Sequence, residues 1–459
     1  MLAIGFAVGS FTYSQVAIVP ALPILRRDLH TTTAWATWTV TAYLLVAAVA
    51  MPISGKLGDQ FGKKRVFVMS QAFFLLGLLG ACAATTIGQL IACRLVQGLG
   101  GGVVPLSFAI ARDELPKERI GVGIGIISMM YALGTTLSFA ASGLLVDHFG
   151  WRAIFAVGAI AVGIAVALAV MVIPHSPAKT WSRVDVLGAT VLGASLVCVL
   201  LALTQGVPWG WLSLRTDSLF AAGIASFAGW VSLERRTAFP MVDVKMLAKR
   251  ALLVTNVATV AMGSVMYASQ ILVASFVEAP RGMPVAVGSR INYGFGASAA
   301  IAGLYLVPGT ILGALTASLV GLASRRHDPK WALAGTLLVG AGGMLSFALW
   351  HTRPWEVLLA GLAIGLGPAA TQAGIAGLIT RAVEPDQTGT ALGMNAVMRV
   401  VGNVIGTQCV AAILASVTIA HTAIAAEEAF VACGAMLAGL AVSAAVGILF
   451  VGHEHQQRA

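Results

Sequence analysis

Charged residues are scarce in this sequence. Asp, Glu, Lys and Arg together make up 10% of its 459 residues, whereas hydrophobic residues make up 58%. Soluble domains carry about 25% charged residues, so the composition excludes an ordinary water-soluble domain. Apolar runs of about 18 residues or more with few charges are typical of membrane-spanning helices, and such runs recur along most of the chain. The sequence therefore indicates an all-α integral membrane protein.

The sequence also lacks the residue patterns of common metal sites and enzymes. It contains no CxxC and no His/Cys zinc spacing, and its five cysteines lie inside apolar runs, where cysteine packs as a small hydrophobic residue. It contains no HExxH, and no Ser, His and Asp grouping falls within the apolar runs. We expect no cofactor, no metal and no enzymatic activity, with a membrane-embedded enzyme as the alternative from a different class.

Apolar runs separated by short polar loops predict fourteen membrane spans. A span needs about 20 residues, and no loop between the runs is long enough for a soluble domain. The predicted spans are residues 1–24, 35–54, 66–84, 88–110, 120–145, 152–173, 186–204, 218–233, 251–276, 299–322, 331–350, 355–379, 388–415 and 429–451.

Lys and Arg are unevenly distributed between the two sides of these spans. With the N-terminus inside, the inner loops and tail carry 19 Lys and Arg and the outer loops carry 7, while Arg94 and Arg399 lie within spans. Cytoplasmic loops are enriched in Lys and Arg, so we expect both termini in the cytoplasm and the protein in the plasma membrane. The net charge of +10 is spread over these loops, so it does not predict binding to nucleic acid.

A faint repeat divides the chain into two halves. The segment GKLGDQFGKK (55–64) follows the second span, and the similar basic segment GLASRRHDPK (321–330) follows the tenth. Transporters built from repeated halves show such weak internal symmetry. We therefore expect a six-helix bundle in residues 1–173, two inserted helices and a basic linker in 174–250, and a second six-helix bundle with a short tail in 251–459.

Two motifs give these features a family resemblance. GKLGDQFGKKR (55–65), between spans 2 and 3, resembles the signature loop of the major facilitator superfamily, and CRLVQGLGGG (93–102) resembles its span-4 motif. The fourteen spans resemble the drug:proton antiporter branch, which has two extra central helices. The resemblance implies alternating-access export of small lipophilic compounds, driven by protons, by a monomer in the lipid bilayer.

Two segments depart from the pattern of that branch. Its span-1 Asp position is Ser14 here, and its Gly-Pro antiporter motif in span 5 reads SFAASG (138–143), without proline. An uncoupled facilitator or an importer of the same superfamily therefore remains the alternative.

The signature loop is predicted to act as a conformational latch. Glycines let a short loop turn tightly, and the cations hold the loop in the cytoplasm. The resemblance implies that Asp59 meets a helix N-terminus of the other half, where an anion is favoured. The alternative is a solvated loop that only sets topology. The predicted latch residues are Gly55, Gly58, Asp59, Gly62, Lys63, Lys64 and Arg65.

Polar residues inside the spans are the candidates for a transport cavity. A charge within a span is costly and is expected to face a cavity or a partner, which makes Arg94 and Arg399 the main candidates. The alternatives are a structural Arg94 bonded to backbone carbonyls and an Arg399 at the helix interface. The predicted cavity residues are Arg94, Gln97, Gln15, Tyr13, Tyr131, Asn256, Tyr267, Gln270, Gln372, Asn395, Arg399 and Asn403.

Carboxylates are absent from the middle of every predicted span. Proton coupling requires a group that titrates within the moving part of a transporter. The candidates are Asp113, at the inner end of span 4, and Glu278, at the outer end of span 9. A charge that merely marks the membrane boundary is the alternative for both.

Overall fold

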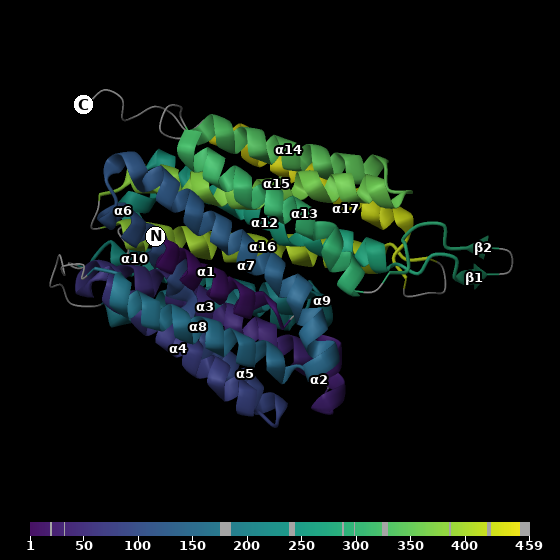
Figure 1. Cartoon of the computed structure of the whole chain (residues 1–459), viewed down its shortest axis with the longest axis horizontal. Helices are drawn as coiled ribbons and strands as arrows, with labels where there is room; N and C mark the ends of the chain where they lie inside the picture. Colours follow the sequence, from purple (N-terminus) through teal and green to yellow (C-terminus); the bar gives the residue numbers. More distant parts are fainter. Residues whose placement is uncertain are drawn as a thin grey trace.

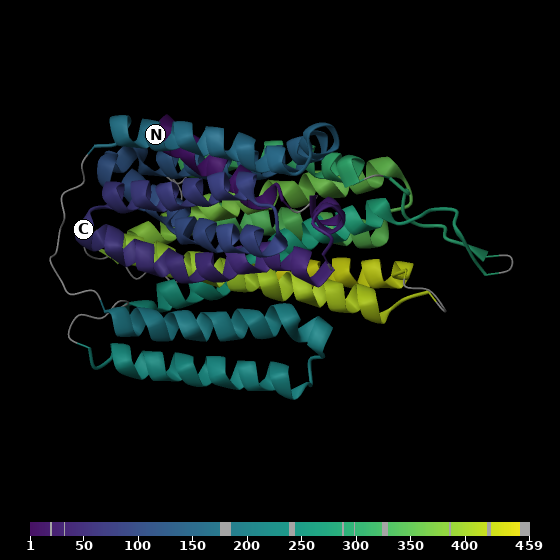
Figure 2. The ribbon, with the colours of Figure 1, turned by 90° about the horizontal axis from the view of Figure 1, so that it is seen from below.

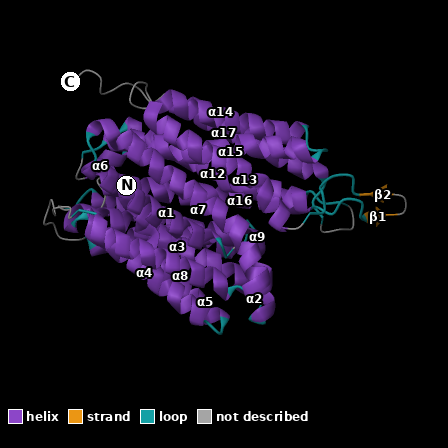
Figure 3. Ribbon diagram, in the orientation of Figure 1, coloured by secondary structure: helices purple, strands orange, loops and turns teal. Residues whose placement is uncertain are grey.

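The structure is a computed structural model of the chain, and it consists almost entirely of helices (Figure 3). It describes residues 1–18, 21–31, 33–174, 185–237, 244–286, 289–297, 299–323, 329–384, 387–419 and 424–449. Parts of the predicted linker in 174–250 and the tail after residue 449 lie outside these described residues.

The helices follow one another along the chain with short connections. The N-terminal part contains α1 (Leu2–Val16), α2 (Leu22–Asp28), α3 (Thr33–Phe61), α4 (Lys63–Ala83), α5 (Ile87–Gly98), the 3₁₀ turn η2 (Leu99–Gly102), α6 (Val103–Glu114), η3 (Lys117–Arg119), α7 (Ile120–Phe149) and α8 (Arg152–Val172). The central part contains α9 (Val186–Trp209), α10 (Leu214–Glu234) and α11 (Val244–Leu247). The C-terminal part contains α12 (Arg250–Glu278), α13 (Ala299–Ala323), α14 (Pro329–Leu349), α15 (Pro354–Ala382), α16 (Thr388–Ser416) and α17 (Glu427–Leu449).

Eleven helices within the described ranges are long and apolar enough to cross a membrane, and the segment α5–η2–α6 counts as one of them. Helices are expected here because lipid offers no hydrogen bonds to the backbone, and a helix satisfies its own N–H and C=O groups. The prediction of an all-helical membrane protein is therefore confirmed at the level of these eleven candidate spans.

The first predicted span, residues 1–24, is wrong as a single helix. α1 ends at Val16, and a separate helix α2 begins at Leu22. Pro20 and Pro23 fall in this stretch, and proline disfavours a helix interior because it lacks an N–H and clashes with the preceding turn. Proline is tolerated in the first turn of a helix, which is where α2 carries one.

A small β-hairpin interrupts the helical pattern between α12 and α13. Its strands, β1 (Pro284–Ala286) and β2 (Ser289–Arg290), pair antiparallel and project from one end of the molecule (Figures 1 and 2). The sequence predicts only a loop in this region. A hairpin this short leaves the fold class unchanged.

Helices from the two parts of the chain meet mainly along two contacts, with smaller ones of α7 with α15 and of α6 with α16. α3 packs on α16, and α7 packs on α13. The remaining large contacts are mostly within one part, such as α4 with α8 or α12 with α16, and Figure 1 shows the C-terminal helices gathered above the N-terminal ones. α9 and α10 pack together at the edge of the molecule (Figure 2), where α9 also contacts both α3 and α16.

Candidate functional site

The segment GKLGDQFGKKR is mostly helical. α3 continues to Phe61 and α4 begins at Lys63, so Gly55 and Gly58 lie inside α3 rather than in a loop, which corrects their predicted role in turning the chain. Gly62 alone takes a positive φ, 94°, the left-handed region that favours glycine. Gly55 serves close packing instead, because a Cβ there would fall inside contact distance of the Gly389 carbonyl oxygen.

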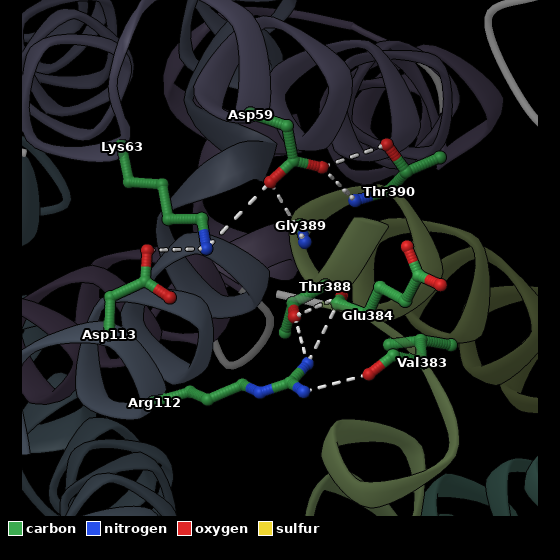
Figure 4. A network of polar contacts seen from close by, with 9 residues as sticks. All are labelled: Asp59, Lys63, Arg112, Asp113, Val383, Glu384, Thr388, Gly389 and Thr390. Atoms are coloured by element: carbon green, nitrogen blue, oxygen red, sulfur yellow. Dashed lines mark hydrogen bonds and ion pairs between the residues drawn. The ribbon is translucent and has the colours of Figure 1, made fainter. Parts of the chain in front are cut away.

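Asp59 lies against the start of α16, in the other part of the chain (Figure 4). Its Oδ1 accepts a hydrogen bond from the Gly389 N–H at 3.3 Å, and its Oδ2 accepts from the Thr390 N–H and hydroxyl, both at 3.1 Å. The first N–H groups of a helix have no partner within the helix and attract anions. Asp59 is 7% exposed, so this contact is largely shielded from water.

Lys63 lies between two carboxylates (Figure 4). Its Nζ is 3.8 Å from Asp59 Oδ1 and 2.7 Å from Asp113 Oδ2, and the residue is 3% exposed. Lys63 is therefore a buried cation rather than part of a solvated loop, which was the alternative for this segment, and the pairing with two acids offsets the cost of burying it. Lys64 donates to the Val170 carbonyl at 2.9 Å, and Arg65 is exposed.

Arg112, at the end of α6, forms a second contact between the two parts of the chain (Figure 4). Its guanidinium donates to the Val383 carbonyl at 2.7 Å, to the Glu384 carbonyl at 3.3 Å and to the Thr388 hydroxyl. These acceptors belong to the end of α15, the connection after it and the first turn of α16. We call Asp59, Arg112 and their hydrogen-bond partners at 383–390, together with Lys63 and Asp113, the inter-half network.

Sequence reasoning missed Arg112. A basic residue at the end of a span is the ordinary signal of a cytoplasmic boundary, and nothing in its neighbours distinguishes it. Its partners lie more than 270 positions away, so no local pattern could reveal them.

Arg94, on α5, is fully buried and well supplied with acceptors. Its guanidinium donates to the Thr39 carbonyl at 2.9 Å, the Gln15 carbonyl at 3.2 Å and Gln97 Oε1 at 2.7 Å. It also stacks over the Tyr43 ring, 4.7 Å from the centroid. These contacts tie together α1, α3 and α5, and among the described residues no carboxylate pairs with Arg94.

The three predicted cavity residues of α16, Asn395, Arg399 and Asn403, make different contacts. Asn395 donates to Asn256 Oδ1 at 3.0 Å and to Thr259 Oγ1 at 2.8 Å, both on α12. Asn403, with its amide nitrogen facing carbonyls, donates to Gly263 at 2.9 Å and to Arg399 at 3.2 Å. The two asparagines therefore attach α16 to α12.

Arg399 faces an aromatic pair instead. Its guanidinium lies 5.5 Å from the centroid of the Tyr131 ring, on α7, a distance typical of a cation–π contact. Tyr267, on α12, lies close to Tyr131. Arg399 is 4% exposed.

A small hollow lies between α6, α15 and α16. It brings together three of the predicted cavity residues, Gln372, Asn395 and Arg399, and its other walls are apolar. The lining residues are Val104, Pro105, Phe108, Gln372, Ala376, Leu392, Asn395, Ala396 and Arg399.

The other predicted cavity residues lie outside this hollow. The Tyr13 hydroxyl, Gln97 Nε2 and Gln270 Oε1 are buried without a hydrogen-bond partner among the described residues. Gln15 contributes its backbone carbonyl to Arg94. Glu278 is exposed at the last turn of α12, whereas Asp113 belongs to the inter-half network.

Curated proteins similar to this chain are named as export and resistance proteins. The tetracenomycin C resistance and export protein of Streptomyces glaucescens is 26% identical over 426 residues, covering 91% of this chain and 76% of its own. The multidrug resistance protein B homolog of Mycobacterium tuberculosis is 28% identical over 395 residues, covering 84% and 70%.

Solved structures of transporters share the fold. The human organic anion transporter MFSD10 superposes with a TM-score of 0.68 at 16% identity, covering 97% of this chain and 98% of that one. A proton:xylose symporter superposes with a TM-score of 0.65 at 13% identity, covering 98% and 95%. Likenesses at these identities concern the fold alone.

The family profile described as Major Facilitator Superfamily matches residues 4–406. This is the family that the motifs at 55–65 and 93–102 predict, and the match extends over most of the chain. The chain therefore belongs to the Major Facilitator Superfamily, and it is a membrane transporter rather than an enzyme.

Proposed function

We propose that the protein exports small lipophilic compounds from the cell by alternating access. The observation that carries this proposal is the inter-half network, which joins the ends of α3 and α6 to the connection before α16 through side chains that can separate again. The export and resistance names of the similar proteins support the direction and the substrate class.

In this proposal the chain has fourteen spans arranged as two six-helix bundles. Residues 1–173 and 251–459 form the bundles, and α9 and α10 within 174–250 are inserted between them. The order of the helices along the chain, and the contacts α3–α16 and α7–α13 between its two parts, support this arrangement. The protein acts as a monomer in the plasma membrane with both termini in the cytoplasm, and the excess of Lys and Arg in the predicted inner loops supports this orientation.

The network serves as the cytoplasmic gate. When it is formed, Asp59 satisfies N–H groups at the start of α16, Lys63 links Asp59 to Asp113, and Arg112 holds the connection that precedes α16. The cytoplasmic end is then closed. Opening that end requires the contacts of Asp59 and of Arg112 with 383–390 to break together, because both join the two parts of the chain, whereas the pairs of Lys63 lie within the N-terminal part.

Proton coupling is part of the proposal, with Asp113 as the better placed candidate. Its carboxylate pairs with Lys63, which also lies beside Asp59, so its protonation would change the balance of charge next to the contact of Asp59 with α16. Glu278 is exposed at the end of α12, and no contact to the gate or to Arg94 joins it among the described residues.

Everted membrane vesicles test the proposal. A panel of lipophilic dyes and antibiotics is added outside the vesicles, and uptake is compared with vesicles from cells that lack the protein. Export in the cell corresponds to uptake here, and substrate-dependent release of protons from acidified vesicles supports coupling. Uptake only down a concentration gradient indicates a facilitator, and no uptake of any compound contradicts the export function.

A further inference from the structure

The two buried arginines differ in how their charges are satisfied. Arg94 donates to three oxygens on three helices. The Arg399 guanidinium donates no hydrogen bond to any described residue, although the residue is only 4% exposed. The guanidinium lies beside the aromatic pair of Tyr131 and Tyr267 instead.

The depth of Arg399 makes this state costly. It lies eleven residues after the start of α16 at Thr388, which corresponds to about 17 Å along a helix that rises 1.5 Å per residue. The apolar layer of a bilayer is about 30 Å thick. A charge at such a depth is expected to pair with another charge or to line a ligand pathway.

The surrounding helices provide no carboxylate for that pairing. Among described residues, the acids of the helices that surround the hollow lie at helix ends, namely Asp113 and Glu114 on α6, Glu278 on α12 and Glu356 on α15. Asp113 is already paired with Lys63. The ring of Tyr131 stabilises a cation through its π face, but it accepts none of the five N–H donors of a guanidinium.

The hollow beside Arg399 is small, about 10 Å³, so a ligand there requires the surrounding helices to separate. The Gln372 side chain, also buried and without a described hydrogen-bond partner, lines the same space. Val104, Phe108 and Leu392 are among its apolar walls. A guanidinium and an amide therefore face one space together with an apolar surface, and guanidinium recognises carboxylate and similar anions with two parallel hydrogen bonds.

We propose that Arg399 binds the anionic group of amphipathic organic acids, so that the transport site prefers substrates with one carboxylate, sulfonate or ionised phenol on an apolar aromatic body. Arg94 is a structural residue in this assignment. The inference rests on the proposed transport site but not on the direction of transport or on proton coupling.

The test measures binding to the full-length protein in lipid nanodiscs by calorimetry. The probes are 2-naphthoate, the neutral 2-naphthamide and the cationic 2-naphthylmethylamine, which share the aromatic body and differ in charge. The expected result is binding of naphthoate about ten- to a hundredfold more tightly than the amide, as for a hydrogen bond to a charged group. Empty nanodiscs correct for partition into lipid.

Arg399→Gln is expected to abolish this preference, whereas Arg399→Lys retains part of it, because a point charge replaces a planar fork. Arg281→Gln, which removes a cation from the exposed loop after α12, is the matched control and is expected to keep the full preference. Melting temperatures of the three variants establish that each is folded. If Arg399→Gln does not fold, the comparison of the three probes on the unaltered protein, together with Arg399→Lys, decides the assignment.

A second arm adds sodium chloride to a low-salt buffer that contains no organic acid. If chloride displaces naphthoate when both are present at the same concentration, the site is one for inorganic anions. The assignment to organic acids is then overturned. Equal binding of the three probes, tighter binding of the cation, or no binding of naphthoate at millimolar concentration also overturns it. If vesicles take up neutral compounds while the anion preference fails, the export function stands and only the role of Arg399 is refuted. If naphthoate binds selectively but vesicles take up no compound, only the export function is refuted.

Discussion

Replacing Asp59 by asparagine is expected to open the cytoplasmic end of the protein. The carboxylate accepts three hydrogen bonds from the first turn of α16 and lies 3.8 Å from Lys63. Asparagine loses the negative charge, and its amide nitrogen is a donor that would face other donors. The substitution therefore removes the attraction to the helix N-terminus and leaves N–H groups of α16 unsatisfied.

The expected size of the effect follows from the burial of this contact. Hydrogen bonds to a charged group contribute about 1.5–3 kcal/mol, and Asp59 is only 7% exposed, so water does not replace them in the closed state. A loss of about 2–3 kcal/mol shifts the ratio of closed to open molecules by roughly 30- to 150-fold. The total expression of the protein is expected to stay normal, because the contact is made in only one part of the cycle.

Labelling of a cysteine in the hollow measures this shift. Ala376→Cys places a thiol in a buried part of α15 that lines the hollow, in a protein without the five native cysteines. In everted vesicles the Asp59→Asn variant is expected to transport less. Its cysteine is expected to label faster from the cytoplasmic side, by up to roughly 150-fold, which is the upper end of the expected shift in the ratio of closed to open molecules. Asp217→Asn, an exposed acid in the first turn of α10, is the control. Unchanged labelling and transport in Asp59→Asn would refute the gate.

Three further outcomes follow from the structure. Gly55→Ala should lower transport in vesicles at normal expression, because the added Cβ would meet the Gly389 carbonyl of α16. The control Gly163→Ala should transport normally, because no atom lies within 4 Å of its Cβ. Equal transport by the two variants would argue against close packing at Gly55. Lys63→Gln should lower the melting temperature and transport more than Lys64→Gln, since it leaves two acids without their buried cation. A cysteine replacing Met283 should react with an impermeant maleimide only from outside, and a cysteine replacing Lys64 should react only from the cytoplasm. Labelling of both cysteines from one side would contradict the proposed topology.

The sequence contains enough information to predict the broad fold, because the solvent of a membrane protein acts on each segment separately. An apolar run of about 20 residues is stable as a helix in lipid before it meets any neighbour. The run 152–173 and the helix α8 (Arg152–Val172) differ by a single residue at the C-terminal end. The family motif at 55–65 is also visible in the sequence, because its residues are contiguous. Its resemblance to the family predicts that Asp59 contacts a helix N-terminus of the other half.

The tertiary structure decided what the individual polar residues do. Asp59 and Gly389 are 330 positions apart, and no local pattern indicates that Lys63 is buried between two acids or that Arg112 reaches the connection before α16. Arg94 and Arg399 look alike in the sequence, as single cations in apolar spans. Their roles separate only when the chain folds, because three oxygens surround Arg94, while Arg399 is left with an aromatic face and a hollow. Hydropathy depends on each residue and its neighbours in the chain, whereas the partner of a buried charge depends on which helices pack against it.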